Sequence, residues 1–299
     1  MWRFEREQKA FEVGGVRIGG DPGTRPTVLV GSIFYRGHGI VTDELRGEFD
    51  RREAEALIKT QEEFSDRTGN PCMLDVVGAS SEALVKALDF AAGASSCPLL
   101  MDGVSPPIRV DALGYVEEAG LSGRVVYNCI TPEYKPPELE ALARSSVDCA
   151  VLLAYNTRDF TTRGRLEAIR GLIPPILEAG VGKILVDTCV LDIPSLGSAC
   201  RAILEAKSEL GYPAGCGAHN AIGTWRGLRT KMGRQARSPG MAVACALPVA
   251  AGGDFVLYGP IDEAPSIFPA VALADAAYSQ LALEEGRRPD RSHPRFRIP

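Results

Sequence analysis

Polar side chains with hydrogen-bonding or acid–base chemistry interrupt apolar runs at several separate places in this chain. Each one lies inside a run of apolar residues or directly after it. A carboxyl group in a buried strand is costly unless it is paired or hydrogen-bonded, so the recurrence needs an explanation. One such residue can be structural, as the cap of a nearby loop, but several that converge on one place predict a binding site. The residues are Asp75, Asp102, Asn128, Asn156, Asp187 and the pair His219-Asn220.

The residue types in this set restrict the ligand. Carboxylates and amides are rich in acceptors and the amides also donate, whereas a phosphate would be repelled by the aspartates. A flat ligand with neighbouring donors suits them better. A carboxylate can accept hydrogen bonds from both the N3–H and the 2-amino group of a 2-amino-4-oxo-pyrimidine, and amide side chains can pair with the ring nitrogens. The set therefore indicates a pterin.

The elements that would position these residues alternate regularly along the chain. Short β-rich runs recur, and segments with helical periodicity lie between them. The runs are continuous apolar stretches, as expected for parallel strands that are covered on both faces. The eight runs span residues 27–34, 72–77, 98–104, 125–130, 147–156, 184–190, 214–220 and 255–260. This pattern predicts a (β/α)8 TIM barrel, with a doubly wound sheet as the alternative, and a barrel gathers its chemistry at the carboxyl ends of its strands.

The other segments complete a single domain over residues 1–299. Residues 1–26 contain FEVGG followed by VRIGG, which predicts a β-hairpin that caps the bottom of the barrel. The helices that the periodicity predicts span residues 48–67, 80–93, 165–180, 194–211 and 265–285.

The composition argues against several classes of protein. The chain has 33 Lys and Arg against 38 Asp and Glu, a formal charge of −5, which does not favour nucleic acid as a partner. No apolar run approaches the roughly 18 residues that span a bilayer, and the charged amino terminus has no signal-peptide core, so we expect no membrane segment. The eight cysteines include no C-x-x-C pair, which is typical of reduced thiols in a cytoplasmic protein.

A bound metal is not expected. The histidines His38, His219 and His293 have no neighbouring Cys or second His at ligand spacing. We interpret His219 as a hydrogen-bonded histidine at the end of a strand, with a chemical role as the alternative. We interpret His293 as a solvent-facing residue of a polar tail.

Several of these residues stand in segments that resemble a known family. The segments are EVGGVRIGG (12–20), PTVLVGSIFY (26–35), TGNPC (68–72), VYN (126–128), HN (219–220), AGGDFVLYGPI (251–261) and APSIFPAVALAD (264–275). The chain resembles the H-subunit family of tetrahydromethanopterin S-methyltransferase and its soluble relatives, the methylcorrinoid:tetrahydrofolate methyltransferases. The resemblance implies a pterin-binding barrel that works with a corrinoid (cobalamin) protein, and a homodimer. Asp and Asn at equivalent strand ends hold the pterin in the wider group of such barrels, and these positions match Asp75, Asp102, Asn128, Asp187 and Asn220 here.

The resemblance also implies the reaction. A methyl group would move between the corrinoid protein and N5 of tetrahydrofolate, in the direction of tetrahydrofolate. In this interpretation Asn220 contacts N5, and Asp102 or Asp75 carries a proton. Asp187 and Asn128 would anchor the pyrimidine edge. By analogy within the family, the absence of an anchoring segment favours a soluble enzyme that uses folate rather than methanopterin.

Two other functions stay open. Dihydropteroate synthase shares the barrel and the pterin pocket, but it needs a lysine on strand seven, where this chain has His219-Asn220. A pterin-binding subunit without catalytic activity is the second alternative. Schiff-base chemistry is not indicated, because Lys183 precedes its strand at the bottom of the barrel.

Two basic stretches have no assigned role. Residues 157–165 and 224–237 carry clusters of arginine. They are candidates for binding the glutamate tail of folate or an acidic face of the corrinoid protein, and solvated surface is the alternative.

Overall fold

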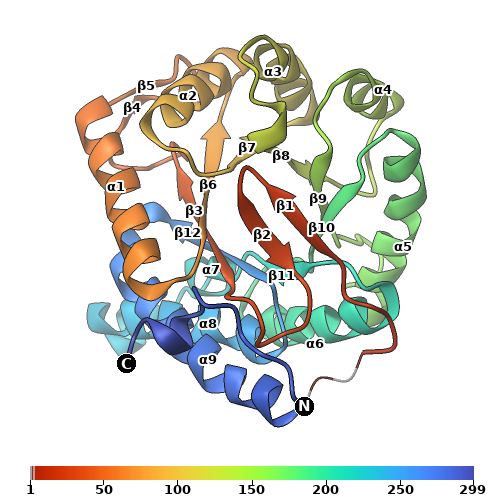
Figure 1. The fold of residues 1–299 in the computed structure, drawn as a ribbon. Helices are drawn as coiled ribbons and strands as arrows, with labels where there is room; N and C mark the ends of the chain where they lie inside the picture. The colour runs from red at the N-terminus through yellow and green to blue at the C-terminus, as the bar shows by residue number, and fades with distance from the viewer. Residues whose placement is uncertain (1, 3) are drawn as a thin grey trace.

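The computed structural model describes residue 2 and residues 4–299, so residues 1 and 3 of the predicted segment 1–26 lie outside it. Its centre is a closed barrel of parallel strands in the order β10-β11-β12-β3-β6-β7-β8-β9 (Figure 1). The strands are β3 (Val28–Ile33), β6 (Cys72–Gly78), β7 (Leu99–Gly103), β8 (Val125–Ile130), β9 (Cys149–Leu153), β10 (Lys183–Asp187), β11 (Ala214–Cys216) and β12 (Phe255–Pro260). Each overlaps one predicted run. The predicted (β/α)8 barrel is therefore confirmed, and the closure of the sheet excludes the doubly wound alternative.

Three strands, β9, β10 and β11, end three or four residues earlier than predicted, and the early end of β11 changes the place of two candidate residues. β11 pairs only two residues with each neighbouring strand. Ala214 has only a methyl group and Gly215 has no side chain, so the strand has little to pack against its neighbours. Beyond Cys216 the chain turns into α7 (His219–Gly223), because the N–H of Asn220 donates to the carbonyl of Gly217. The prediction that His219 and Asn220 end a strand is thus wrong: they begin a short helix.

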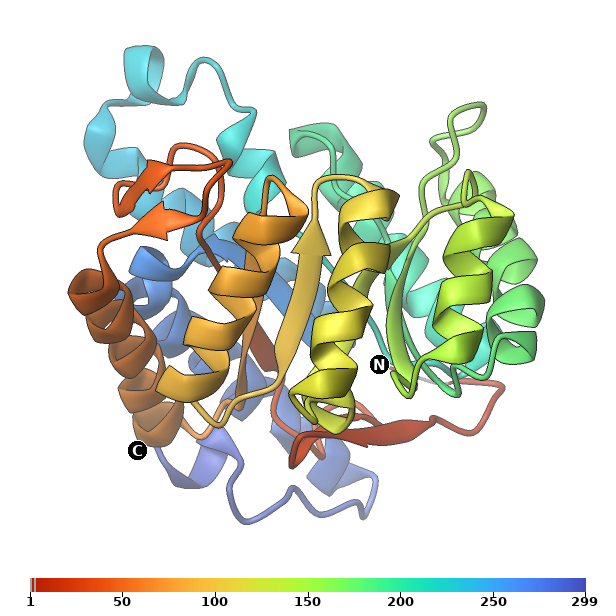
Figure 2. The same cartoon turned by 90° about the horizontal axis from the view of Figure 1, so that it is seen from above.

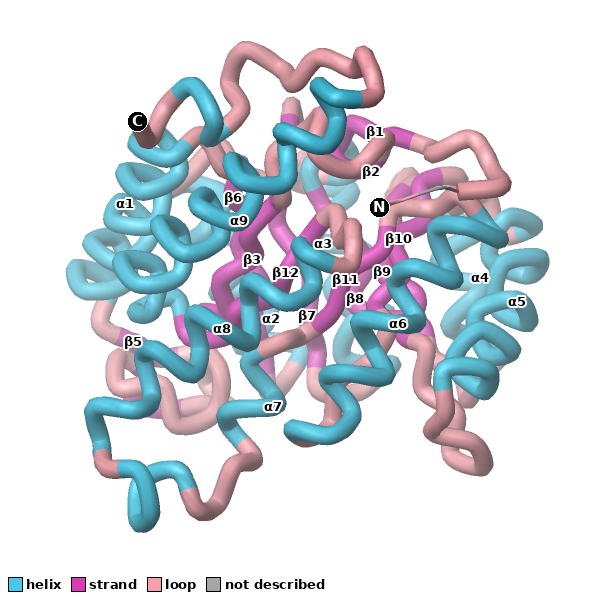
Figure 3. The backbone as a smooth tube through the Cα atoms, turned by 90° about the horizontal axis from the view of Figure 1, so that it is seen from below, coloured by secondary structure: helices cyan, strands magenta, loops and turns pink. Residues whose placement is uncertain are grey.

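Helices surround the strands (Figure 3). Five match the predicted periodicity: α1 (Arg51–Thr68), α2 (Ser81–Ala94), α5 (Thr162–Glu178), α6 (Ile193–Leu210) and α9 (Ala264–Glu284). The sequence does not predict α3 (Pro106–Glu118), α4 (Pro136–Arg144), α7 or α8 (Arg237–Ala250). α3 and α4 begin with two prolines, which the first turn of a helix tolerates because its N–H groups have no partner within the helix. Short helical turns complete the path: η1 (Ser122–Arg124), η2 (Leu228–Met232), η3 (Arg234–Ala236), η4 (Ile261–Glu263) and η5 (Pro294–Phe296).

Side chains alternate between the interior of the barrel and the helices. Along β6, Met73 belongs to the interior cluster, whereas Leu74 and Val76 pack among the residues that face the helices. Because successive strand residues point to opposite faces, the residue two positions after an interior side chain is interior again. After Met73 that residue is Asp75. The apolar runs of the sequence thus contain a polar interior layer near the carboxyl end.

The two ends of the barrel differ (Figure 2). At one end lies an antiparallel hairpin of β1 (Ala10–Val13) and β2 (Val16–Gly19), whose Val13 and Ile18 are buried in the interior cluster. At the other end stand the segments that follow the strands, including a small hairpin of β4 (Val41–Asp43) and β5 (Glu48–Phe49) and the segment 219–237.

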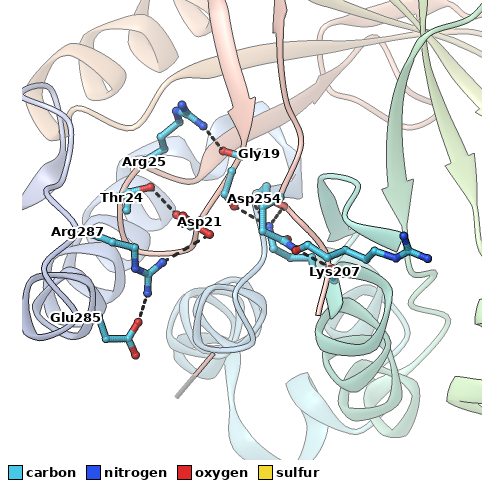
Figure 4. Close-up of polar contacts among 11 residues, drawn as sticks. Gly19, Asp21, Thr24, Arg25, Lys207, Asp254, Glu285 and Arg287 are labelled. Carbon is cyan, nitrogen blue, oxygen red and sulfur yellow. Dashed lines mark hydrogen bonds and ion pairs between the residues drawn. The ribbon is translucent and has the colours of Figure 1, made fainter. Parts of the chain in front are cut away.

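A buried ion pair joins the β1–β2 hairpin to the barrel (Figure 4). Lys207 of α6 lies 2.6 and 2.5 Å from the two carboxylate oxygens of Asp254, and its ammonium group also donates to the carbonyl of Gly20, just after β2. Arg25 donates to the carbonyl of Gly19 at 3.0 Å. The chain that leaves the hairpin is therefore held against α6 and the start of β12.

Residues 261–284, which include α9, form a helical segment apolar and long enough to cross a membrane by length and composition. It packs in the outer layer of the barrel beside α1 and α8. Asp275 of α9 accepts hydrogen bonds from the backbone and hydroxyl of Thr27 and from the amide of Asn70, at 2.6–2.9 Å. These contacts tie the helix to the base of β3, as expected for a barrel helix.

The carboxyl-terminal segment differs from its prediction. His293 is fully buried, so the expectation that it faces solvent is wrong. It comes directly before η5, which packs on α9, and its Nδ1 accepts a hydrogen bond from the N–H of Arg295. Burial lowers the pKa of His293 to about 4.

Candidate active site

A cavity of about 420 Å³ opens at the carboxyl ends of the barrel strands. All five predicted site residues line it, together with residues that the sequence did not single out. The lining consists of Ser32, Tyr35, Asp75, Val77, Asp102, Asn128, Cys129, Leu153, Asp187, Gly217, His219, Asn220, Leu257, Gly259 and Pro260.

Asp75 lies at the centre of a hydrogen-bonded group. Ser32 is its register partner on β3 and donates its hydroxyl to Asp75 Oδ2 at 2.6 Å. The Asn128 amide donates to Asp75 Oδ1 at 3.2 Å. Burial raises the pKa of Asp75 to about 6, although both hydrogen bonds favour the ionised form and act against this shift. Both carboxylate oxygens of Asp75 are therefore occupied by protein donors.

Asp102 has no such support. It is paired in register with Asn128, on the strand between Asp75 and Asn128, and it makes no side-chain hydrogen bond within residues 4–299. Burial and the nearby charge of Asp75 raise its pKa well above the usual range, against the effect of Arg109. Burial and a like charge together favour its protonated form, which can donate a hydrogen bond.

Asp187 ends β10 on the far side of the cavity. Its Oδ1 accepts the N–H of Cys189 at 2.7 Å, and the N–H of Gly217 also donates to its carboxylate. Cys189 has a φ of 60°, a conformation rare for a residue with a side chain, and it directs its N–H back to the carboxylate. Burial raises the pKa of Asp187 to about 6, and the two backbone donors lower it.

His219 and Asn220 approach the cavity from α7. His219 Nδ1 lies 3.1 Å from the carbonyl of Leu257, and its ring rests against Gly259, where an added Cβ would come within 2.6 Å of the ring. Burial lowers the pKa of His219, so the ring is neutral at pH 7, and donation from Nδ1 leaves Nε2 as an acceptor. The predicted hydrogen bond of His219 is confirmed. Asn220 is exposed at the rim, and its amide has no hydrogen-bond partner in the described part of the chain.

Asn156 is the one polar strand-end residue of the sequence that does not reach the cavity. Its Oδ1 accepts the N–H groups of Arg158 and Asp159, and its amide donates to the carbonyl of Gly164. Asn156 caps the loop after β9, so its role is structural.

The three arginines of the basic stretch 157–165 differ: Arg158 is exposed, and Arg163 is exposed and pairs with Glu167 at 2.8 Å. Arg165 is buried in α5 and donates to the carbonyls of Thr188 and Cys189 at 2.8 and 3.1 Å. It thereby holds the turn that follows Asp187.

Two residues that line the cavity, Ser32 and Tyr35, are not among the predicted site residues. Ser32 stands two positions after the interior Val30, so the alternation of β3 marks it as interior. Tyr35 stacks on His38 with ring centroids 4.5 Å apart, and His38 lies 3.3 Å from Asp262. Burial and the charge of Asp262 raise the pKa of Tyr35 to about 12. No pattern in the sequence pointed to this aromatic pair.

The described residues, 2 and 4–299, contain no group of three or more His, Cys, Asp or Glu side chains that could hold a metal ion.

Comparison with known families assigns the chain. The family described as tetrahydromethanopterin S-methyltransferase MtrH subunit matches residues 6–289. The chain therefore belongs to this MtrH family. The H subunit of tetrahydromethanopterin S-methyltransferase from Methanothermobacter thermautotrophicus is 40% identical over the full length of both chains. The H subunit of a putative methyltransferase named mtx, from Methanosarcina mazei, is 36% identical over 98% of each chain. The family that the sequence motifs indicate is confirmed.

Solved structures support the fold of this MtrH family member. A dihydropteroate synthase from Yersinia pestis aligns with a TM-score of 0.61 at 15% identity, over 91% of this chain and 100% of that chain. The dihydropteroate synthase of Xanthomonas albilineans in complex with 7,8-dihydropteroate aligns with a TM-score of 0.59 at 20% identity, over 90% and 98%. At this identity the likeness establishes the barrel architecture and no more.

Proposed function

We propose that this protein transfers a methyl group between N5 of a tetrahydropterin and a corrinoid that a partner protein carries. The observation that supports this most is the joint presence of Asp75, Asp102, Asn128 and Asp187 in one cavity, in a member of a methyltransferase subunit family. Their carboxyl and amide groups complement the donors and acceptors of a pterin.

The pyrimidine edge of the pterin binds at Asp187. Its carboxylate is buried, and a buried charge gains most from hydrogen bonds with the N3–H and 2-amino donors of the ligand. Asn128 is already oriented by its bond to Asp75 and presents its remaining amide groups to the ring. Val77, Leu153 and Leu257 supply apolar contact for the flat ring system.

Asp102 and Asn220 serve the reacting nitrogen. The corrinoid of the partner protein supplies or accepts the methyl group. N5 must be unprotonated to take up a methyl group and must gain positive character to lose one, so a group that holds a proton close by assists. Asp102, whose protonated form is favoured, fills this role, and the Asn220 amide donates to N5 from the rim.

The identity of the pterin is the finer part of the proposal. The resemblance of the sequence motifs to methylcorrinoid:tetrahydrofolate methyltransferases implies tetrahydrofolate, whereas relatives at 35–40% identity are named for tetrahydromethanopterin. Both ligands carry the pterin head that the cavity complements. Those relatives are named as subunits, which supports a protein partner. We further propose a homodimer that works in the cytoplasm.

Titration of the purified protein tests the assignment. We expect calorimetry to detect binding of tetrahydrofolate or tetrahydromethanopterin. With methylcobalamin as the methyl donor, the cobalt absorbance should change only when protein and pterin are both present. Binding without any methyl transfer would favour the pterin-binding subunit that lacks activity. Absence of binding for both pterins would contradict the proposal.

A dihydropteroate-synthase-like activity is not favoured. That reaction needs a lysine on the seventh barrel strand, and β11 (Ala214–Cys216) has none. Formation of dihydropteroate from p-aminobenzoate and a pterin diphosphate would restore this alternative.

A further inference from the structure

A second cavity, of about 530 Å³, lies at the carboxyl end of α7, whereas the candidate active site lies at its amino end. It is built by the segment that leads from α7 to α8, which rises above the mouth of the barrel (Figure 2). Four arginines line it: Arg226, Arg229, Arg234 and Arg237. The proposed methyl transfer makes no use of them.

The charge of this cavity is not balanced by nearby acids. Residues 210–253 contain no Asp or Glu. Arg237 pairs with Glu263 of η4 at 3.1 Å, whereas Arg226, Arg229 and Arg234 have no carboxylate within 4.0 Å among residues 2 and 4–299. Three exposed guanidinium groups around one hollow attract an anion, and their planar donors match carboxylate and phosphate oxygens.

The floor of the cavity is apolar. Leu228 and Ile222 are buried in the hydrophobic core, and the half-buried Trp225 packs against it. A ligand with a flat or apolar part beside its charge would therefore fit better than a small hydrated ion. The hollow shape also suits a small molecule better than the flat, mostly polar face of a protein partner.

The two cavities are neighbours. His219 and Asn220, at the start of α7, line the candidate active site, which we call the acidic cavity. Ile222 and Gly223, at the end of α7, line the second cavity, which we call the basic cavity. A helix rises about 1.5 Å per residue, so the two linings are separated by one turn. A ligand that extends from one cavity into the other would pass from carboxylates to guanidinium groups.

We infer that the basic cavity binds the anionic tail of the pterin whose head occupies the acidic cavity. This inference rests on the proposed function. The tail it requires has an aryl or other apolar part followed by carboxylates or a phosphate, so that Trp225 contacts the former and Arg226, Arg229 and Arg234 pair with the latter. Pterins with this chemistry differ in tail length and charge, and the cavity discriminates among them.

Binding of pterins that share a head and differ in tail tests the inference. The ligands are 6-methyltetrahydropterin, which has no tail, tetrahydrofolate with one or with five glutamates, and tetrahydromethanopterin. We expect tailed ligands to bind the native protein at least about 10-fold more tightly than the tailless one, with a gain that falls at high salt. The arm with the larger gain identifies whether a polyglutamate or the methanopterin tail is the natural ligand.

Variants test whether the arginines of the basic cavity cause the tighter binding of tailed pterins. Arg229→Ala/Arg234→Ala should remove most of this gain in affinity and leave the affinity for the tailless pterin within about 2-fold. Arg229→Lys/Arg234→Lys keeps the charge and should retain part of it. Arg17→Ala serves as the matched control, since Arg17 is an exposed arginine of β2 at the opposite end of the barrel. All variants have exposed positions, and circular dichroism verifies their fold.

The outcomes separate this inference from the proposed function. Equal affinity of the native protein for tailed and tailless pterins would overturn the inference and leave the proposed function intact. An unchanged gain in the double alanine variant would also overturn it, and a concurrent loss of binding to an acidic partner protein would assign the cavity to that partner. Failure of every pterin, including the tailless one, to bind would contradict the proposed function itself.

Discussion

Asn128 of β8 donates its amide to the carboxylate of Asp75 on β6 over 3.2 Å, across the strand that carries Asp102. The hydroxyl of Ser32 donates a hydrogen bond to the other carboxylate oxygen of Asp75 at 2.6 Å. The group stabilises one negative charge next to an Asp102 that has no hydrogen-bond donor of its own among residues 4–299. Two neighbouring carboxyl groups are thereby given different protonation preferences, as acid–base chemistry requires.

Asp187→Asn should weaken binding of the pterin by about 2–4 kcal/mol, because it replaces a charged acceptor in a desolvated site and turns one donor toward the donors of the ligand. Calorimetry with the pterin that binds the native protein gives the difference. Asp66→Asn, an exposed change on α1, is the control and should have no effect. An unchanged affinity in Asp187→Asn would remove Asp187 from the binding site.

The same substitution should increase stability in a pH-dependent manner. The folded-state pKa of Asp187 is about 6, above its ordinary value of 3.8, so its contribution to stability is fully present below pH 3.8 and is lost as the pH rises through 6. The neutral amide of the variant has no such loss. We expect the free energy of unfolding of the variant to exceed that of the native protein by about 2–3 kcal/mol above pH 7, and this excess to vanish near pH 4.

Denaturant unfolding at several pH values measures this excess. A constant difference between pH 4 and pH 8 would show that the carboxylate of Asp187 is not destabilised by burial.

Asn220→Ala should separate chemistry from binding. Asn220 is exposed at the rim, so its removal leaves Asp187 and Asn128 to hold the pyrimidine side of the pterin. If the amide contacts N5 mainly as its charge changes, the rate constant of methyl transfer falls by about 10²-fold or more, whereas affinity falls much less. Single-turnover kinetics with methylcobalamin, beside a binding titration, gives both quantities.

Thr230→Ala, an exposed change in the same segment, is the control for Asn220→Ala. Equal losses of rate and affinity in Asn220→Ala would show that Asn220 only binds the pterin. No loss in either would indicate that Asp102 or Asp75 contacts N5 instead.

Lys207→Ala should destabilise the fold by about 3–5 kcal/mol, because it leaves the carboxylate of Asp254 buried without its counter-charge. Arg287→Ala, at a more exposed pair with Glu285 and Asp21 in the same region, should cost less than about 1 kcal/mol (Figure 4). Thermal unfolding compares the two variants. Similar small losses in both would mean that the buried pair contributes no more than a surface one.

Treatment with a chelator should leave methyl transfer unchanged. The described residues hold no cluster of metal ligands, and burial raises the pKa of the Cys189 thiol to about 12, which disfavours the thiolate that a metal requires. Activity assays before and after dialysis against the chelator provide the measurement. A loss of activity that zinc restores would contradict this prediction, and Cys189 and Cys216 would be the first ligands to test.

The sequence alone determined the barrel and the chemical character of its mouth. Eight apolar runs separated by helical segments leave few other folds, since parallel strands need both faces covered and a connection for each. The polar residues near the ends of those runs, such as Asp75 and Asp187, are costly unless they share a purpose. Local composition carries this information because strand periodicity and burial are local consequences of residue type.

Only the tertiary structure decided which of these polar residues face the ligand and what they contact. Asn128 and Asn156 both follow apolar runs, yet Asn128 reaches Asp75 two strands away, whereas Asn156 caps its own loop. His293, in a polar segment, is buried where η5 packs on α9. Closure of the barrel and the packing of loops on it set these contacts, and they depend on distances between segments far apart in the chain, which no local pattern records.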